Sequence, residues 1–165
     1  MDMNKLTTGD KILGISGIVL FVFSFFNWLG VSVDFKGVVS VSGSKNAWSF
    51  TLTLIAVLIG VVLVAYVAAK AGGVKLPELG SVTWGQIVLG LAVIAFLFIL
   101  IKLIAGPNID TSGLSGVSKT RKFGIFVGLV ASAGMVVGAY LNIKESGELP
   151  GSLGGSKGGA TPPTA

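Results

Sequence analysis

Serine and lysine form the only catalytic pairing that the composition of this sequence permits with ease. The 165-residue chain contains no histidine and no cysteine, which excludes imidazole general bases, thiolate nucleophiles, disulfides and metal sites built on either residue. A Ser–Lys mechanism needs a buried lysine beside a serine. Lys102 lies in a long apolar segment, and that segment contains no serine. We therefore expect no enzymatic activity.

The acidic residues and the glycine-rich segments show no catalytic or cofactor-binding pattern either. Asp34, Asp110, Glu145 and Glu148 fall in different loops or tails, without paired spacing. The glycine-rich stretch 151–159 lacks the strand–loop–helix context of a phosphate-binding loop. We therefore expect no cofactor and no metal.

A basic cluster, Lys119, Arg121 and Lys122, is the clearest concentration of charge. The net charge of +5 comes from twelve Lys and Arg residues that are spread through every loop. Such a distribution favours attraction to anionic lipid headgroups over nucleic-acid binding. The cluster is thus a candidate lipid-headgroup contact, and the alternative is that it only fixes the end of the helix that follows.

The composition indicates a membrane protein, so the charged residues discussed above must be positioned by membrane-spanning segments. Hydrophobic residues make up 52% of the chain and charged residues only 12%, against about 25% charged in ordinary soluble domains. Apolar segments long enough to cross about 30 Å of hydrocarbon occur at 12–29, 48–69, 84–104 and 123–141. Asp10 or Thr8 is the expected cap of the first helix. No acidic residue lies within these four spans, and Lys102 is close enough to an end to reach the headgroups.

Small residues predict where the four helices pack. In lipid, burying leucine between helices gains little free energy, and small residues let the backbones approach closely. The expected helix-packing residues are Gly14, Gly17, Gly60, Gly124, Gly128, Ser132, Gly134 and Gly138. They favour packing within one chain, as a four-helix bundle. A sharper hypothesis is that Gly134 and Gly138 form a second ridge that pairs two copies.

Tryptophans near the span ends predict the membrane interface. Trp28 and Trp48 are expected at one interface and Trp84 at the other, because amphipathic rings prefer the headgroup region.

The remaining segments complete the predicted organisation: an N-terminal segment 1–11, a four-helix transmembrane domain 12–145 and a disordered Gly/Ser/Pro tail 146–165. Between the first two helices, Val31-Ser32-Val33 and Val39-Ser40-Val41-Ser42 alternate apolar and polar residues, which predicts a β-hairpin. The connection 106–120 is rich in turn residues. The predicted fold class is therefore an all-α membrane bundle of four transmembrane helices with a small hairpin-like loop.

Orientation in the membrane is not fixed by charge. Six Lys or Arg residues fall on each side of the predicted bundle, so the positive-inside rule ties. We expect both termini in the cytoplasm, because Lys5 and Lys11 closely precede the first span, and the opposite orientation stays open.

Three short sequence elements resemble those of small four-span actinobacterial membrane proteins of uncharacterised function. They are the Lys5–Ile12 start before Phe25-Phe26-Asn27-Trp28, the Asn46-Ala47-Trp48 segment, and Arg121-Lys122-Phe123-Gly124 continuing to Gly138-Ala139-Tyr140. The resemblance covers about residues 5–50 and 119–145, and it implies a four-span topology but no activity.

These observations predict a multi-pass protein of the cell membrane that acts without catalysis. We expect a scaffold or accessory subunit that works through helix–helix association, with the lipid bilayer, a second copy or another membrane protein as partner. The alternative is a component of a small transporter or channel, which would need a polar path between the helices.

Overall fold

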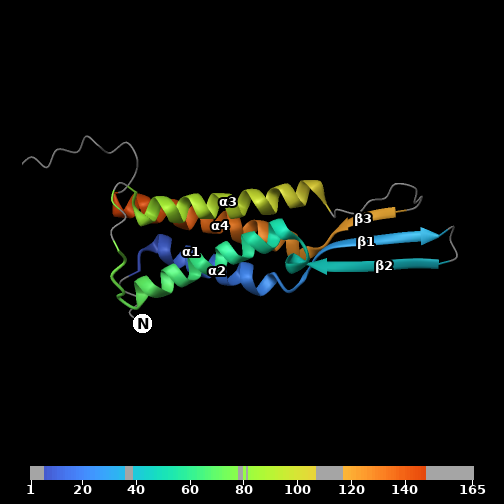
Figure 1. The fold of residues 1–165 in the computed structure, drawn as a ribbon, viewed down its shortest axis with the longest axis horizontal. Coiled ribbons are helices and arrows are strands. Elements are labelled where there is room, and N and C mark those ends of the chain that lie inside the picture. The colour runs from blue at the N-terminus through green and yellow to red at the C-terminus, as the bar shows by residue number, and fades with distance from the viewer. Residues whose placement is uncertain (1–5, 36–38, 78–79, 81, 107–116, 148–165) are drawn as a thin grey trace, which may run out of the picture.

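The computed structural model describes residues 6–35, 39–77, 80, 82–106 and 117–147. In this part of the chain, four α-helices form an elongated bundle, and a small β-sheet continues its long axis at one end (Figure 1). The elements are α1 (Thr8–Phe23), β1 (Asn27–Phe35), β2 (Val39–Asn46), a 3₁₀ turn η2 (Ala47–Ser49), α2 (Thr51–Ala71), α3 (Trp84–Ala105), β3 (Val117–Arg121) and α4 (Phe123–Ser146).

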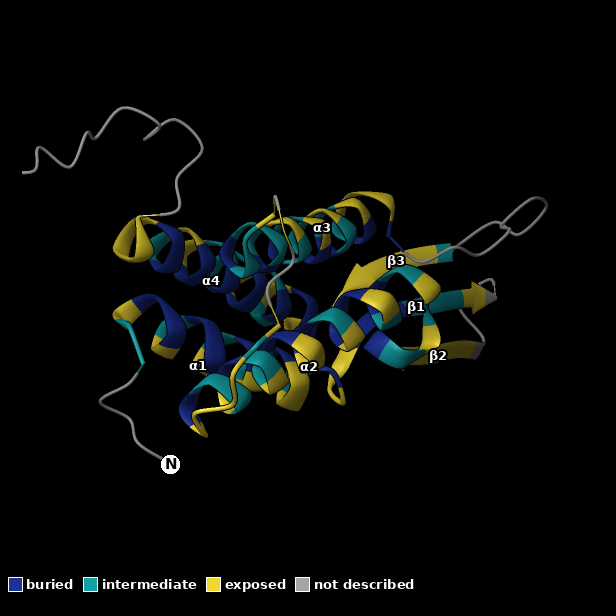
Figure 2. Ribbon diagram, turned by 60° about the vertical axis from the view of Figure 1, so that its left-hand side comes forward, coloured by how far each residue is buried: buried dark blue, intermediate teal, exposed yellow. Residues whose placement is uncertain are grey.

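The helices form a ring in which neighbours run antiparallel. α1 packs against α2 and α4, and α3 packs against the same two helices from the other side. The end of the bundle from which the strands extend is called the sheet end below, and the opposite end, where α1 begins and α4 finishes, is called the Asp10 end. Buried residues line the inside of the ring and exposed residues its outside (Figure 2).

Three helices, α2, α3 and α4, are long and apolar enough to cross a membrane within the described residues. Their outward side chains are largely aliphatic or aromatic, for example Val62 on α2, Ile104 on α3 and Val130 on α4, all more than half exposed. Such a surface is unfavourable in water and favourable in hydrocarbon. α1 has only 16 residues, so the expectation of four full-length spans is met for three helices.

The first helix is shorter than the span 12–29 that the sequence predicts. It begins after Thr7, which is the N-cap in place of the expected Asp10 or Thr8: Thr7 Oγ1 accepts from the Asp10 amide, and Asp10 Oδ2 accepts from the Thr7 amide. It ends at Phe23 because the chain turns there into β1. The Trp28 indole donates to the Phe23 carbonyl at 2.8 Å, which satisfies an acceptor at the helix terminus.

The predicted hairpin is present and is one part of a larger sheet. β1 and β2 pair antiparallel, with Val33 opposite Val41 and Ser32 opposite Ser42. β3, which was expected to belong to a turn-rich connection, adds to the other edge of β1, so the strand order is β2-β1-β3. The turn of the hairpin, residues 36–38, lies outside the described residues.

The two faces of this sheet have different chemistry. Residues paired across an antiparallel ladder share a face, so the row Ser42, Ser32 and Ser118 is a row of hydroxyl groups. The row Val41, Val33 and Val117 lies on the opposite face. Alternation of polar and apolar residues, which predicted the hairpin, therefore separates a serine face from a valine face.

Segment boundaries also differ at the two chain ends. α1 begins within the predicted N-terminal segment 1–11, and α4 extends to Ser146, five residues beyond the predicted span. Of the tail predicted to be disordered, residues 148–165 lie outside the described residues. Residues 107–116 of the third connection also lie outside them.

Candidate functional site

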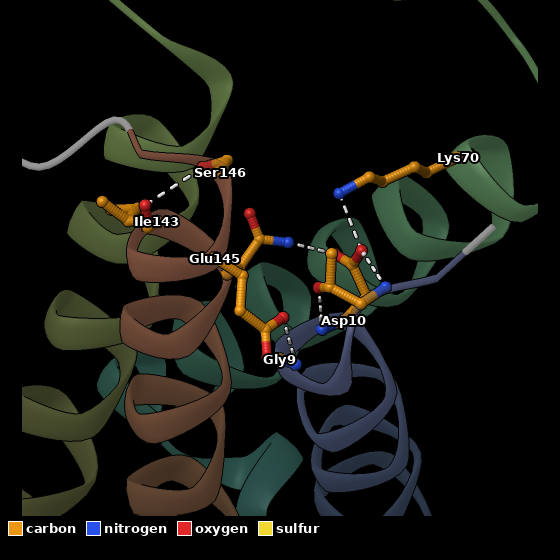
Figure 3. A network of polar contacts seen from close by, with 8 residues as sticks. Gly9, Asp10, Lys70, Ile143, Glu145 and Ser146 are labelled. Atoms are coloured by element: carbon orange, nitrogen blue, oxygen red, sulfur yellow. Dashed lines mark hydrogen bonds and ion pairs between the residues drawn. The ribbon is translucent and has the colours of Figure 1, made fainter. Parts of the chain in front are cut away.

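A buried carboxylate, Asp10, organises the end of the bundle opposite the sheet. Its side chain has no exposed surface. One carboxylate oxygen accepts from the amide group of Asn142 on α4, and the other lies 2.7 Å from the ammonium of Lys70 on α2. Asp10 thus joins three of the four helices (Figure 3).

A second contact reinforces this junction between the first and last helices. The Gly9 amide donates to the carboxylate of Glu145 at 3.4 Å, close to the Asp10 group (Figure 3). Glu145 is exposed and Lys70 is about one-third exposed, so water reaches the outer part of the cluster. Asp10 and Asn142 form its dry centre.

The sequence places no acidic residue within the four predicted spans, and Asp10 precedes the first of them by two residues. Asp10 lies in the first turn of α1 and is fully buried. A capping-box spacing, Thr7 followed three residues later by Asp10, is visible in the sequence. The partners Lys70 and Asn142 are not, because they are distant in the chain.

The closest helix contact is between α1 and α4, and glycines make it possible. A methyl group on Gly138 would come within 2.6 Å of the Leu13 amide nitrogen and 2.8 Å of the Gly9 carbonyl oxygen. One on Gly134 would come within 2.5 Å of the Ser16 hydroxyl. Both glycines therefore face α1 of the same chain, and the pairing of two copies through them stays a hypothesis.

The other predicted packing residues also lie between elements of one chain. Gly14 and Gly17 face Val67 and Val64 of α2, and Gly60 faces Leu20 of α1. Ser132 is buried in α4 and donates to the Leu129 carbonyl at 2.9 Å.

Trp28 occupies a notch in α4 instead of a position among lipid headgroups. Its side chain has no exposed surface, and methyl groups on Gly124 or Gly128 would approach the indole to about 2.6 and 2.5 Å. Trp28, which was predicted to lie at the membrane interface, therefore packs β1 against α4.

The other two predicted anchors lie at opposite ends of the bundle and are partly exposed. Trp48 donates to the Ser24 hydroxyl at 3.0 Å, and its ring lies against Phe25 at the sheet end. Trp84 donates to the Pro77 carbonyl and stacks on Tyr66.

The three residues of the predicted basic cluster have different surroundings. Arg121 donates to the carbonyls of Leu103 and Ile104 at 2.7 and 3.3 Å, so it caps α3 and not the fourth helix. The Lys122 side chain lies over Gly30 of β1, whereas Lys119 is exposed on β3. Arg121 is thus committed to a structural contact.

Acidic residues do not gather into a possible metal site within the described residues. No group of three or more His, Cys, Asp or Glu residues lies together among them. Every fully buried side-chain nitrogen or oxygen in this part of the chain has a hydrogen-bond partner.

Comparison with protein-family models, curated proteins and solved structures finds no match to this chain.

Proposed function

We propose that the chain is an integral membrane protein of the cell envelope, with α1 as its fourth span, and that it acts as a non-enzymatic scaffold or accessory subunit. α1 is about 24 Å long at 1.5 Å per residue, which is somewhat less than a hydrocarbon core. Its outward side chains support insertion: Ile15, Ile18 and Val22 are each about half exposed or more. The exposed rings of Phe25 and Phe26 follow directly and would extend the apolar surface to the interface.

The proposal that the protein associates with another helix rests on a groove between α1 and α2. Two adjoining hollows of about 210 and 230 Å³ lie along these helices, and Ile18 and Val64 line both. The lining runs from Leu6 to Phe21 and is almost entirely apolar. A groove as long as α1 suits the ridge of one apolar helix. The proposed occupant is a transmembrane helix of another membrane protein.

Photocrosslinking in native membranes tests this association. A photoreactive phenylalanine analogue replaces Ile18 in the groove or, as a matched control, Val130, which is 72% exposed on the outer face of α4. We expect a discrete protein adduct from position 18 and none from position 130. Lipid adducts alone at position 18, from a protein that is correctly inserted, would refute the proposed occupant.

The alternative, a transporter component, is favoured by one observation, the buried Asp10 beside Lys70. Buried ionisable groups are typical of ion pathways in membranes. Asp10 and Asn142, however, are both buried and satisfy each other by a hydrogen bond. Ion or proton flux in proteoliposomes that exceeds the empty-vesicle rate and is lost in Asp10→Asn would favour this function over the scaffold.

A further inference from the structure

Lys102 is the most buried cation in the described part of the chain and has no anionic partner there. It lies on the last turn of α3 at the sheet end and is only 2% exposed. Its ammonium lies 4.2 Å from the centre of the Phe50 ring, and among the described residues it forms no hydrogen bond or ion pair. Burying an ammonium without an anion is costly.

A cavity explains where this ammonium points. Lys102 and Phe50 line a hollow of about 280 Å³ together with Lys45, Ser49, Thr51 and Leu52. No fully buried side-chain nitrogen in the described residues lacks a hydrogen-bond partner. The unpaired Lys102 ammonium is therefore not sealed in protein, and the cavity is the space that it adjoins.

Three groups on different elements give the cavity a positive electrostatic potential. Lys102 contributes from α3 and Lys45 from the end of β2. Thr51 and Leu52 are the first two residues of the 21-residue helix α2, and no side chain caps that terminus. A helix N-terminus presents free amide groups and a partial positive charge. No carboxylate is among the lining residues.

We propose that this cavity is a binding site for a phosphate group. Lys102 and Lys45 would pair with its charge, and the Thr51 hydroxyl and the free amides at the start of α2 would donate to its oxygens. A phosphate suits this combination because it offers several acceptor oxygens to donors on different elements. The uncapped helix and the unpaired lysine then have one common explanation.

The position of the cavity indicates a phospholipid headgroup as the source of the phosphate. The cavity lies where α2 begins and α3 ends, and Phe50 and Leu52 give it an apolar wall beside the polar groups. A lipid phosphate with the first part of its acyl chain matches such a lining, and free phosphate shares the same recognition chemistry. Only the lipid source depends on the membrane insertion proposed above.

Binding to the purified full-length protein in an uncharged detergent tests the site. The probes are inorganic phosphate and dihexanoyl phosphatidylglycerol, with chloride at equal ionic strength and a phosphate-free diacylglycerol as controls. We expect at least one phosphate probe to bind and to raise the unfolding temperature. Lys102→Met should weaken binding by about tenfold or more, because it removes a charge-assisted contact, whereas Lys144→Met, an exposed position on α4 at the opposite end of the bundle, should not.

The two probes distinguish the two sources. Binding of both supports recognition of the phosphate itself, and binding of the lipid alone supports a headgroup site. Binding of inorganic phosphate alone supports a soluble ligand. If neither binds more tightly than its control, the proposal is wrong.

A rim variant keeps the test decisive if Lys102→Met does not fold. Lys45 is exposed, so Lys45→Met should fold normally and reduce phosphate affinity several-fold. Unchanged affinity in Lys45→Met and in any Lys102→Met that folds would overturn the assignment. The crosslinking result at Ile18 does not depend on either outcome.

Discussion

Asp10 shows how a single buried residue can define the arrangement of helices. A carboxylate without exposed surface is stable only when its oxygens are paired, and here the partners come from its own helix start, from α2 and from α4. Neither the Lys70 nor the Asn142 contact can form unless the helix ends meet in this register. The cluster therefore specifies the packing at the Asp10 end.

Removing the carboxylate should destabilise the bundle measurably. Asp10→Ala leaves the buried Asn142 amide without its acceptor, and we expect a loss of about 1–3 kcal/mol in the free energy of unfolding. Lys144→Ala, an exposed substitution on the same turn of α4, should change stability by less than about 0.5 kcal/mol. Unfolding in detergent micelles measures both, and equal stabilities of the two variants would show that the cluster is incidental.

Residue-scale features could be predicted from sequence only where they are local. The capping box of α1 needs residues three positions apart, and its spacing is readable. The contact of Asp10 with Asn142 spans 132 positions, and nothing in the sequence marks that pair. Lys102 was recognised as an unusual residue, but its burial depends on Phe50 and on the start of α2.

At the scale of elements, glycine decides how closely α1 and α4 approach. A methyl group on Gly138 would meet backbone atoms of α1. A methyl group on Gly90 of α3 would have no neighbouring atom within 4 Å. Two glycines of similar helical setting therefore have opposite surroundings, which makes them a matched pair.

The pair gives a direct prediction. Gly138→Ala forces α1 and α4 apart and should cost about 1–3 kcal/mol. Gly90→Ala should be neutral or stabilise by up to about 1 kcal/mol, because alanine is favoured over glycine inside a helix. Unfolding of both variants in the same detergent checks this, and a Gly138→Ala protein as stable as Gly90→Ala would mean that the close contact is not formed.

Elements with a strong local pattern were predictable, and those that depend on distant pairing were not. The spans of α2, α3 and α4 and the hairpin follow from apolar length and from alternation. β3 has only five residues, and two helices, α2 and α3, separate it in the sequence from β1, the strand with which it pairs. The early end of α1 depends on the fit of Trp28 against Gly124 and Gly128, a contact that periodicity cannot reveal.

At the scale of the whole molecule, a small β-sheet continues the long axis of the helix bundle beyond one of its ends (Figure 1). The outward faces of the helices suit lipid, and the serine face of the sheet suits water. The Asp10 end and the sheet end would then lie on opposite sides of the membrane, because α2, α3 and α4 each run from one end to the other. The start of α1 would share the side of the α4 end only if α1 also crosses. Whether the chain spans three or four times is therefore the question on which the proposed topology depends.

Cysteine accessibility answers this question, because the natural chain contains no cysteine. Single substitutions Thr8→Cys, Ser42→Cys and Ser146→Cys place thiols at the start of α1, on β2 and at the end of α4, all at exposed positions. With a membrane-impermeant thiol reagent on intact and on permeabilised cells, we expect positions 8 and 146 to be labelled from one side and position 42 from the other. Labelling of positions 8 and 42 from the same side, with 146 opposite, would show that α1 does not cross the bilayer.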